Sequence, residues 1–264
     1  MWTPDMNFLL FVSDRTGGVL LPHVRDMRSG KVSCVTPDGA DDWTLSRKTA
    51  TFFVRQKDTV YCKDVVSFPE NRSALLTDPR LGEFGAFSMS IDADERVLYA
   101  GIVIEPDTKW GIIAIDLDKK VCDVFLEVDF RVGHVQANPL RSGVIMFCHE
   151  TGGDAPQRTW VVNRDGSGLR PFYKETYDEW VTHEVWWGSD RAIFTIWPYD
   201  ERHKQLPHGV VSADFGSGTS HVHSQFPAWH THGSPDGRWA VADDFDGNIW
   251  LIRTESDERR LLTQ

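Results

Sequence analysis

The sequence lacks any apolar run that approaches the roughly 20 consecutive residues needed to cross a membrane as a helix. Its first residues, Met-Trp-Thr-Pro-Asp, also lack the basic segment followed by an apolar one that marks a secretory signal. We therefore expect no membrane partner and a cytoplasmic location.

Cysteine is scarce, and no two cysteines form a C-x-x-C pair. Most of them lie within apolar runs typical of strands, and disulfides are rare in reducing compartments. We interpret all four as buried thiols rather than disulfide partners: Cys34, Cys62, Cys122 and Cys148.

Positive charge is also in short supply. The chain has 28 Lys and Arg residues against 39 Asp and Glu residues, which gives a net charge of -11. A nucleic-acid-binding surface needs clustered basic residues. The charge balance therefore argues against a nucleic-acid partner, whereas an anionic substrate still fits if one pocket is locally positive.

Helical periodicity is almost absent, and short apolar runs recur 42 to 49 residues apart instead. Each run is followed by further strand-like segments separated by polar turns. Repeats of about forty to fifty residues with four strands each are typical of β-propeller blades, so we predict an all-β propeller. The repeated runs begin at Phe8, Ala50, Val97, Gly143, Ala192 and Trp239.

Each repeat closes with a strand, a charged turn and a second strand, which predicts an antiparallel hairpin. The turn in one of them reads Asn-Arg-Asp-Gly. The paired segments are residues 111–115 with 121–125, 159–162 with 169–172, and 248–252 with 260–262.

We count six units, and both ends of the chain look cut. Met1 falls at the turn before a second strand, and Gln264 directly follows an outer strand. A propeller must close its ring because an open sheet edge exposes unpaired backbone groups. Either the ring has six blades with imperfect closure or a seventh blade is absent. We favour the second, and predict one propeller domain over residues 1–264, incomplete at both ends.

Histidine recurs where the chain enters the innermost strands of three successive units. His134 follows Gly133, His183 lies in Thr-His-Glu, and His230 lies in Trp-His-Thr-His. Because the loops entering these strands converge around a propeller's central channel, we expect the three imidazoles to share one face. We expect Arg158, from the loop between two strands of the fourth unit, to reach the same face.

Two H-x-H pairs raise the question of a metal. His230 and His232 lie on one side of a predicted strand, as metal ligands often do, but the pattern alone leaves metal binding undecided. His221 and His223 follow a Gly/Ser-rich segment, so we expect them in a solvated loop, with a metal role left open.

Several motifs occur together along the chain: G-H at 133–134 with Pro139 five residues on, F-C-H-E at 147–150, R-T-W at 158–160 before V-V-N-R-D-G, T-H-E at 182–184, and residues 230–237 ahead of an A-V-A-D strand. In this order they resemble oligogalacturonate lyase. That family is a cytoplasmic seven-bladed propeller that cleaves short uronate oligomers by β-elimination. The resemblance covers nearly the whole chain and is strongest between residues 133 and 187.

The resemblance implies roles for three residues. His183 matches the family's general base, Arg158 its active-site arginine, and His230 one histidine of its manganese site. The implied cofactor is therefore a divalent metal, Mn²⁺. The family's remaining ligands lie in a Q-x-x-H-x-H motif of the closing blade, and this sequence contains no such motif.

Uronate cleavage without water removes the proton at C5 and expels the oxygen at C4. An arginine or a metal bound to the neighbouring carboxylate absorbs the charge that develops, and arginine makes the bidentate contact that lysine cannot. Histidine is neutral near the working pH, which suits His183 as the base. Gln157, His134 and His149 are the candidate substrate-binding residues, although His134 and His149 fit a structural hydrogen-bonding role equally well.

A second hypothesis is a non-catalytic propeller that binds a glycan or a protein partner. A glycosidase is the least favoured, because hydrolysis needs paired carboxylates and the predicted central loops offer mainly histidines. The substrate expected under the first hypothesis is a small uronate oligosaccharide.

Overall fold

The structure is a computed structural model that describes residues 1–67, 70, 72–82 and 89–263. Strands dominate it, and the helices among these residues are two short 3-10 turns, η1 (Val65–Ser67) and η2 (Pro79–Leu81). No helix in this part of the chain has the length and apolar character needed to cross a membrane. The chain divides into two compact units, Met1–Val135 and Gln136–Gln264.

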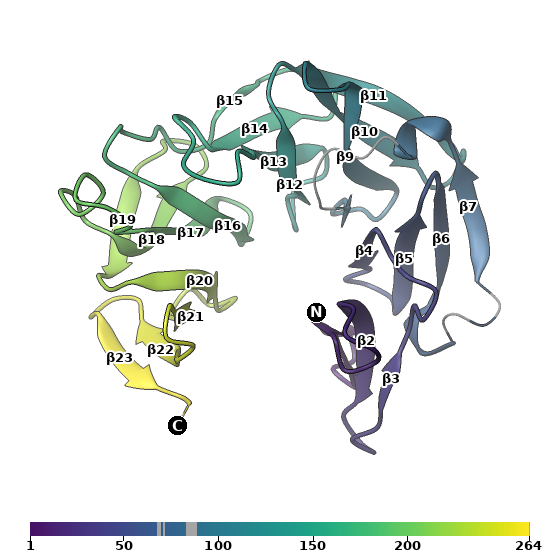
Figure 1. The fold of residues 1–264 in the computed structure, drawn as a ribbon, viewed down its shortest axis with the longest axis horizontal. Helices are drawn as coiled ribbons and strands as arrows, with labels where there is room; N and C mark the ends of the chain where they lie inside the picture. Colours follow the sequence, from purple (N-terminus) through teal and green to yellow (C-terminus); the bar gives the residue numbers. More distant parts are fainter. Residues whose placement is uncertain (68–69, 71, 83–88, 264) are drawn as a thin grey trace. The chain divides into compact units, whose positions relative to one another are not determined.

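The first unit contains three antiparallel sheets of consecutive strands (Figure 1). The first sheet has three strands, and Trp2 adds an isolated bridge to Leu9. The strands are β1 (Phe8–Ser13), β2 (Leu21–Asp26) and β3 (Val32–Cys34), then β4 (Asp42–Leu45), β5 (Thr51–Gln56), β6 (Thr59–Asp64) and β7 (Ser73–Thr77), then β8 (Ser90–Ile91), β9 (Val97–Glu105), β10 (Lys109–Asp116) and β11 (Val121–Val128).

The second unit holds three further sheets of four strands each; the first of them starts with β12, within which the unit boundary falls. The strands are β12 (Val132–Ala137), β13 (Val144–His149), β14 (Thr159–Asn163) and β15 (Arg170–Pro171), then β16 (Val181–Trp187), β17 (Arg191–Ile196), β18 (Gly209–Asp214) and β19 (Ser220–Ser224), then β20 (Ala228–Gly233), β21 (Trp239–Asp244), β22 (Ile249–Arg253) and β23 (Glu258–Leu261).

Six consecutive antiparallel sheets of this kind are propeller blades, so the predicted all-β propeller class is confirmed. The six repeated apolar runs fall in β1, β5, β9, β13, β17 and β21, and the three predicted hairpins are β10–β11, β14–β15 and β22–β23. The single domain over residues 1–264 stays a prediction.

The apolar runs are continuous rather than alternating because each blade packs between neighbours. In β13 the side chains from Ile145 to Cys148 are all fully buried, which a strand covered on both faces requires. Phe172, Trp186 and Phe194 pack together between the sheets β12–β15 and β16–β19. Trp187, Phe226 and Ile252 pack together between the sheets β16–β19 and β20–β23.

The cysteine prediction is right about pairing and only partly right about burial. All four are free thiols. Cys148 is fully buried, and burial raises the pKa of its thiol well above the ordinary value. The other three are half-buried because they lie on short or outer strands, or on the less covered face of a strand.

The expectation for His221 and His223 is wrong. Both lie in β19 rather than in a loop, and only His221 is exposed. His223 is buried, where its Nε2 meets the Ser212 hydroxyl at 2.8 Å and its Nδ1 meets the Thr254 carbonyl at 3.1 Å. Burial lowers the pKa of His223, so the ring favours its neutral form.

Candidate active site

The three predicted histidines lie inside strands rather than in the loops before them, which corrects the prediction. His134 is in β12, His183 in β16 and His230 in β20. His134 and His183 have positive φ angles of 46° and 55°, a backbone conformation that side chains rarely adopt.

A β-bulge explains the unusual backbone at His183. Thr182 pairs with Thr195 and Val185 with Ile193, so His183 and Glu184 together face a single residue of β17. A bulge of this type inserts one residue and turns a side chain out of the regular alternation. The local structure therefore redirects His183 and Glu184 relative to a flat strand.

The next blade repeats the bulge at the same place. Ala228 pairs with Asp244 and Thr231 with Ala242, so Trp229 and His230 face Asp243 alone. In register terms Trp229 corresponds to His183, and His230 corresponds to Glu184. His230 is thus one position away from the repeat position at which the sequence pattern placed it.

The two bulges bring His183 and His230 together. Their ring centroids are 4.1 Å apart, closer than the 5.3 Å between the rings of His183 and Trp197 or the 6.1 Å between those of His230 and Trp229. The Thr195 hydroxyl and the Trp197 indole both donate to the Trp229 carbonyl, at 2.9 and 3.3 Å, and so tie β17 to the start of β20. Two of the predicted site residues are therefore neighbours in space.

Asp243 orients His230. The His230 Nδ1 lies 3.0 Å from Oδ2 and 3.2 Å from Oδ1 of Asp243, and the His230 amide donates to Oδ1 at 2.6 Å. Because an ionised carboxylate only accepts hydrogen bonds, the proton belongs on Nδ1 and the lone pair on Nε2. A carboxylate behind an imidazole is also the usual support of a metal-ligating histidine.

His232 does not share this environment. Its Nδ1 lies 2.9 Å from the carbonyl of its neighbour Gly233. Within the described ranges, no group of three His, Cys, Asp or Glu donors forms around His230 or His232. His230 is therefore suited to be one ligand of a divalent metal. His230 and His232 alone do not complete a tetrahedral or octahedral site.

Arg158, which directly precedes β14, is buried at 4% exposure. Its Nε donates to Glu184 Oε2 at 2.9 Å, and its Nη2 lies 3.6 Å from Glu150 Oε2. Burial is the largest single influence and lowers the pKa of Arg158, but the charge and hydrogen bond of Glu184, together with Cys148 and Glu150, outweigh it and hold the pKa above its ordinary value. The guanidinium is a buried cation held between two carboxylates.

Glu184 supports the scaffold. Its side chain is fully buried, and its backbone carbonyl accepts from the Gln136 amide at 2.7 Å. The bulge turns it toward Arg158, which sequence spacing did not indicate.

Gln157 and Glu175 fix the segment that carries Arg158. Glu175 Oε1 accepts from the amides of Arg158 and Thr159, at 2.7 and 3.0 Å, and from the Gln157 side chain at 3.1 Å. The Gln157 amide also donates to the Tyr173 carbonyl at 2.8 Å. The structure thus places Gln157, a predicted substrate-binding residue, in a network that anchors the backbone.

Burial raises the pKa of Glu175 to about 7, although hydrogen bonds from the backbone amides of Thr159 and Arg158 act to lower it. Its Oε2 is buried and has no hydrogen-bond partner among the described residues. A carboxyl group that titrates near neutrality thus holds the backbone of Arg158.

The positions of His149 and His134 do not decide between a structural and a substrate-binding role. His149 ends β13, is half-buried, and its amide donates to the Arg158 carbonyl at 2.8 Å. His134 lies within the first unit. Their predicted contact with sugar stays a prediction.

Sequence reasoning missed the aromatic surroundings of His183. The Trp197 ring lies 5.3 Å from His183, and the Trp229 ring lies 4.9 Å from that of Trp197. Both of these indoles are only half-buried, so neither is a core residue. Trp229 lies at the start of β20, and Trp197 directly follows β17, the strand paired with β16. These positions beside inner strands were the sequence signal that could have indicated a role in the site.

Charge at the site is not net positive. Among the described residues of the second unit, the cation of Arg158 faces the carboxylates of Glu184 and Glu150, and His230 adds that of Asp243. The imidazole pair can accept a proton and bind oxygen ligands. It needs a further positive charge to hold an anion tightly.

Comparison with known proteins identifies a family and several relatives. The profile described as oligogalacturonate lyase matches residues 104–247. The chain is 30% identical over 166 residues to the oligogalacturonide lyase of Pectobacterium atrosepticum, a match that covers 56% of this chain and 42% of that protein. It is 33% identical over 83 residues to the oligogalacturonate lyase of Dickeya dadantii, covering 31% of this chain and 21% of that protein.

The solved structure of an oligogalacturonate lyase in complex with manganese superimposes with a TM-score of 0.83 at 18% identity, covering all of this chain and 75% of the other. This likeness supports the propeller fold. The matched segments span less than half the length of the two curated relatives. Because the family profile covers more than half of the sequence, the chain belongs to the oligogalacturonate lyase family.

Proposed function

We propose that the protein is a lyase that cleaves short oligogalacturonides by β-elimination. The observation that carries the proposal is the pair of bulges that sets His183 within 4.1 Å of His230, ring to ring, in a chain of this family. The names of the relatives support the substrate class.

In this proposal His183 is the base. A neutral imidazole accepts the C5 proton of the uronate, and the C4 oxygen leaves with the electron pair of its bond. The indoles of Trp197 and Trp229 partly cover His183, which excludes water and strengthens electrostatic interactions there.

Arg158 supplies positive charge toward the uronate carboxylate. Its 2.9 Å bond to Glu184 is short and buried, whereas its 3.6 Å contact with Glu150 is looser. A substrate carboxylate that takes the place of Glu150 beside Nη2 would gain a charge-assisted contact while Glu184 keeps the guanidinium in position.

His230 is the residue of this chain that would hold a divalent metal through Nε2, with Asp243 fixing the ring. When bound, such a metal neutralises the uronate carboxylate and lowers the barrier to removal of the neighbouring proton. The manganese complex of the structural relative supports this choice of metal.

The test is direct. Incubation with digalacturonate and Mn²⁺ should produce the ultraviolet absorbance of an unsaturated uronate. His183→Ala should lower the turnover about 10²- to 10⁴-fold, the usual share of a general base. An unchanged rate in this variant, with wild-type thermal stability, would refute the assignment of the base.

One observation favours a second candidate function, a propeller that binds uronates without cleaving them. Arg158 is paired with two carboxylates, which weakens its pull on a substrate anion. Digalacturonate binding without any unsaturated product, with and without Mn²⁺, would support this candidate over the lyase.

A further inference from the structure

A hollow of about 560 Å³ lies in the second unit, a volume suited to one or two sugar rings. Its wall is mostly apolar, with two prolines and two aromatic rings, and it carries one lysine. The side chains used below are Tyr199, Lys204, Phe245 and Asp246.

The hollow opens at the same end of the blades as His183 and His230. Val181, at the start of β16, pairs with Ile196, at the end of β17, after which the chain enters the segment that lines the hollow. Ala228, at the start of β20, pairs with Asp244, directly before Phe245. Strand register therefore places both lining segments beside the two bulges.

A single layer of indole separates the hollow from the catalytic candidates. The Phe245 ring lies 4.7 Å from Trp229 and 5.3 Å from Trp197, both edge to face. Trp197 in turn lies 5.3 Å from His183. Phe245 is 43% exposed even though it has these aromatic neighbours, so one part of its ring remains available to a ligand.

The chemistry of the wall suits a uronate. Sugar rings present apolar C–H faces that pack on aromatic and proline surfaces, and Lys204 offers a cation for the carboxylate. Lys204 now pairs with Glu201 at 2.8 Å, but both are solvent-exposed and close in sequence. Such pairs contribute little and exchange readily.

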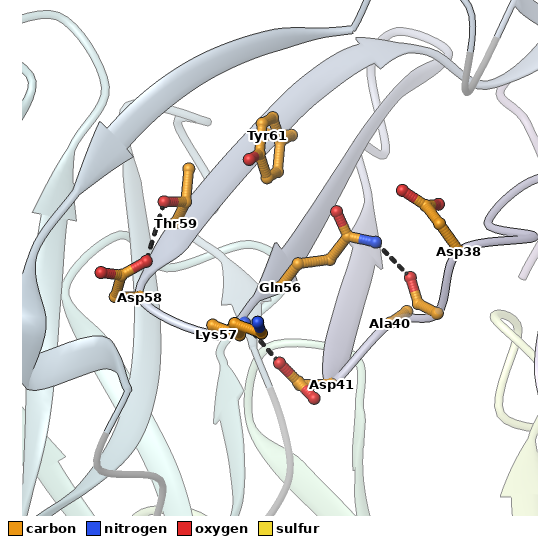
Figure 2. Close-up of a pocket in the computed structure, with 9 residues that line it drawn as sticks. Asp38, Ala40, Asp41, Gln56, Lys57, Asp58, Thr59 and Tyr61 are labelled. Atoms are coloured by element: carbon orange, nitrogen blue, oxygen red, sulfur yellow. Dashed lines mark hydrogen bonds between the residues drawn. The ribbon is translucent and has the colours of Figure 1, made fainter.

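The hollow in the first unit is a useful contrast. It measures about 360 Å³, and Figure 2 shows Asp38, Asp41 and Asp58 around it. Lys57 shares this wall, and Asp38 and Asp41 are paired with Arg72 and Arg55, at 2.8 and 3.8 Å. The acidic residues that line this hollow outnumber its one lysine, whereas the hollow beside Phe245 is lined by Lys204 and Asp246, with Glu201 as the exposed partner of Lys204.

We infer that the hollow lined by Tyr199, Lys204 and Phe245 is a further subsite, which binds a uronate residue beyond the two joined by the bond cleaved at His183. The inference rests on the proposed function for the class of substrate. It predicts that trigalacturonate binds more tightly than digalacturonate.

The test measures binding apart from turnover. In a His183→Ala background, the binding of trigalacturonate is measured by isothermal titration calorimetry. Phe245→Ala should weaken binding on the order of tenfold, and Lys204→Gln about threefold at low salt. Phe245→Tyr keeps the ring and should bind as the parent does.

Lys119→Gln is the matched control, because Lys119 is also exposed and pairs with a carboxylate three residues away. It should leave binding unchanged, and thermal melts should show that Phe245→Ala is folded. Parent-like binding by both Phe245→Ala and Lys204→Gln would overturn the subsite, as would equal affinity for neutral maltotriose. The proposed lyase would fail separately, if the wild-type protein yields no unsaturated product while Phe245→Ala still weakens binding.

Discussion

The bulges of β16 and β20 each hold an acid–base pair, and the two pairs differ in their exposure to water. At β16 the Arg158–Glu184 pair is fully buried, with side chains 5% and 0% exposed. At β20 the His230–Asp243 pair is open, with side chains 56% and 37% exposed. The same backbone device thus produces a pair that supports the fold and a pair that can meet a ligand.

The difference follows from desolvation. A buried charge that loses its partner is left uncompensated in a poorly polar interior, whereas water replaces the partner of an exposed one. We therefore expect loss of the pair at β16 to lower stability, whereas loss of the pair at β20 should lower turnover with little effect on stability.

The largest expected effect is on the buried pair. Glu184→Ala removes the main partner of Arg158 and should lower the free energy of unfolding by about 3 to 5 kcal/mol. Urea denaturation measures this. Arg158→Met with Glu184→Leu is the control, because removing both charges should recover most of the loss. A loss in Glu184→Ala below about 1 kcal/mol would mean that the pair behaves like a surface pair.

Glu175 extends the comparison to pH. Its folded pKa of about 7 exceeds its unfolded value, so the folded protein holds more protons between these values and stability falls as pH rises through this window. The contribution is present below about pH 4 and is lost above about pH 7, on the order of 3 to 4 kcal/mol. Glu175→Gln should flatten this part of a plot of stability against pH. A slope unchanged by the substitution would assign it to other groups.

Asp243→Asn should do the opposite of Glu184→Ala. Stability should change by less than about 1 kcal/mol because the pair is exposed. Turnover should fall about 10- to 100-fold, since an amide no longer fixes the proton on Nδ1 of His230. Nitrogen NMR of labelled histidine reports the tautomer directly. If turnover falls while the Nδ1–H tautomer is retained, the loss of turnover does not come from the tautomer of His230.

Sequence pattern predicted the blades because burial between neighbours demands apolar strands and tight polar turns at a fixed spacing. It failed at the bulges, since one inserted residue leaves no mark in composition yet shifts every later side chain. His230 was therefore placed one register position away, and the contact of Arg158 with Glu184 was not foreseen. Asp243, the partner of His230, is the last residue of the A-V-A-D motif. The sequence does not connect the two residues, because their contact depends on the pairing of β20 with β21.

The family resemblance also named His183 and Arg158, but residues contributed by other segments escaped it. Glu175 reaches Arg158 across 17 residues of chain, and the burial of His223 depends on the Thr254 carbonyl, 31 residues away. Long-range contacts of this kind have no local sequence pattern from which to infer them.

Cys148 gives this site a natural reporter. Its sulfur is fully buried in β13 and lies 3.9 Å from Glu150, a partner of Arg158. A thiol with a raised pKa and no solvent contact cannot react with an alkylating reagent until its strand separates from its neighbours. In a background where the three half-buried cysteines are serine, the alkylation rate of Cys148 would measure how often β13 opens locally.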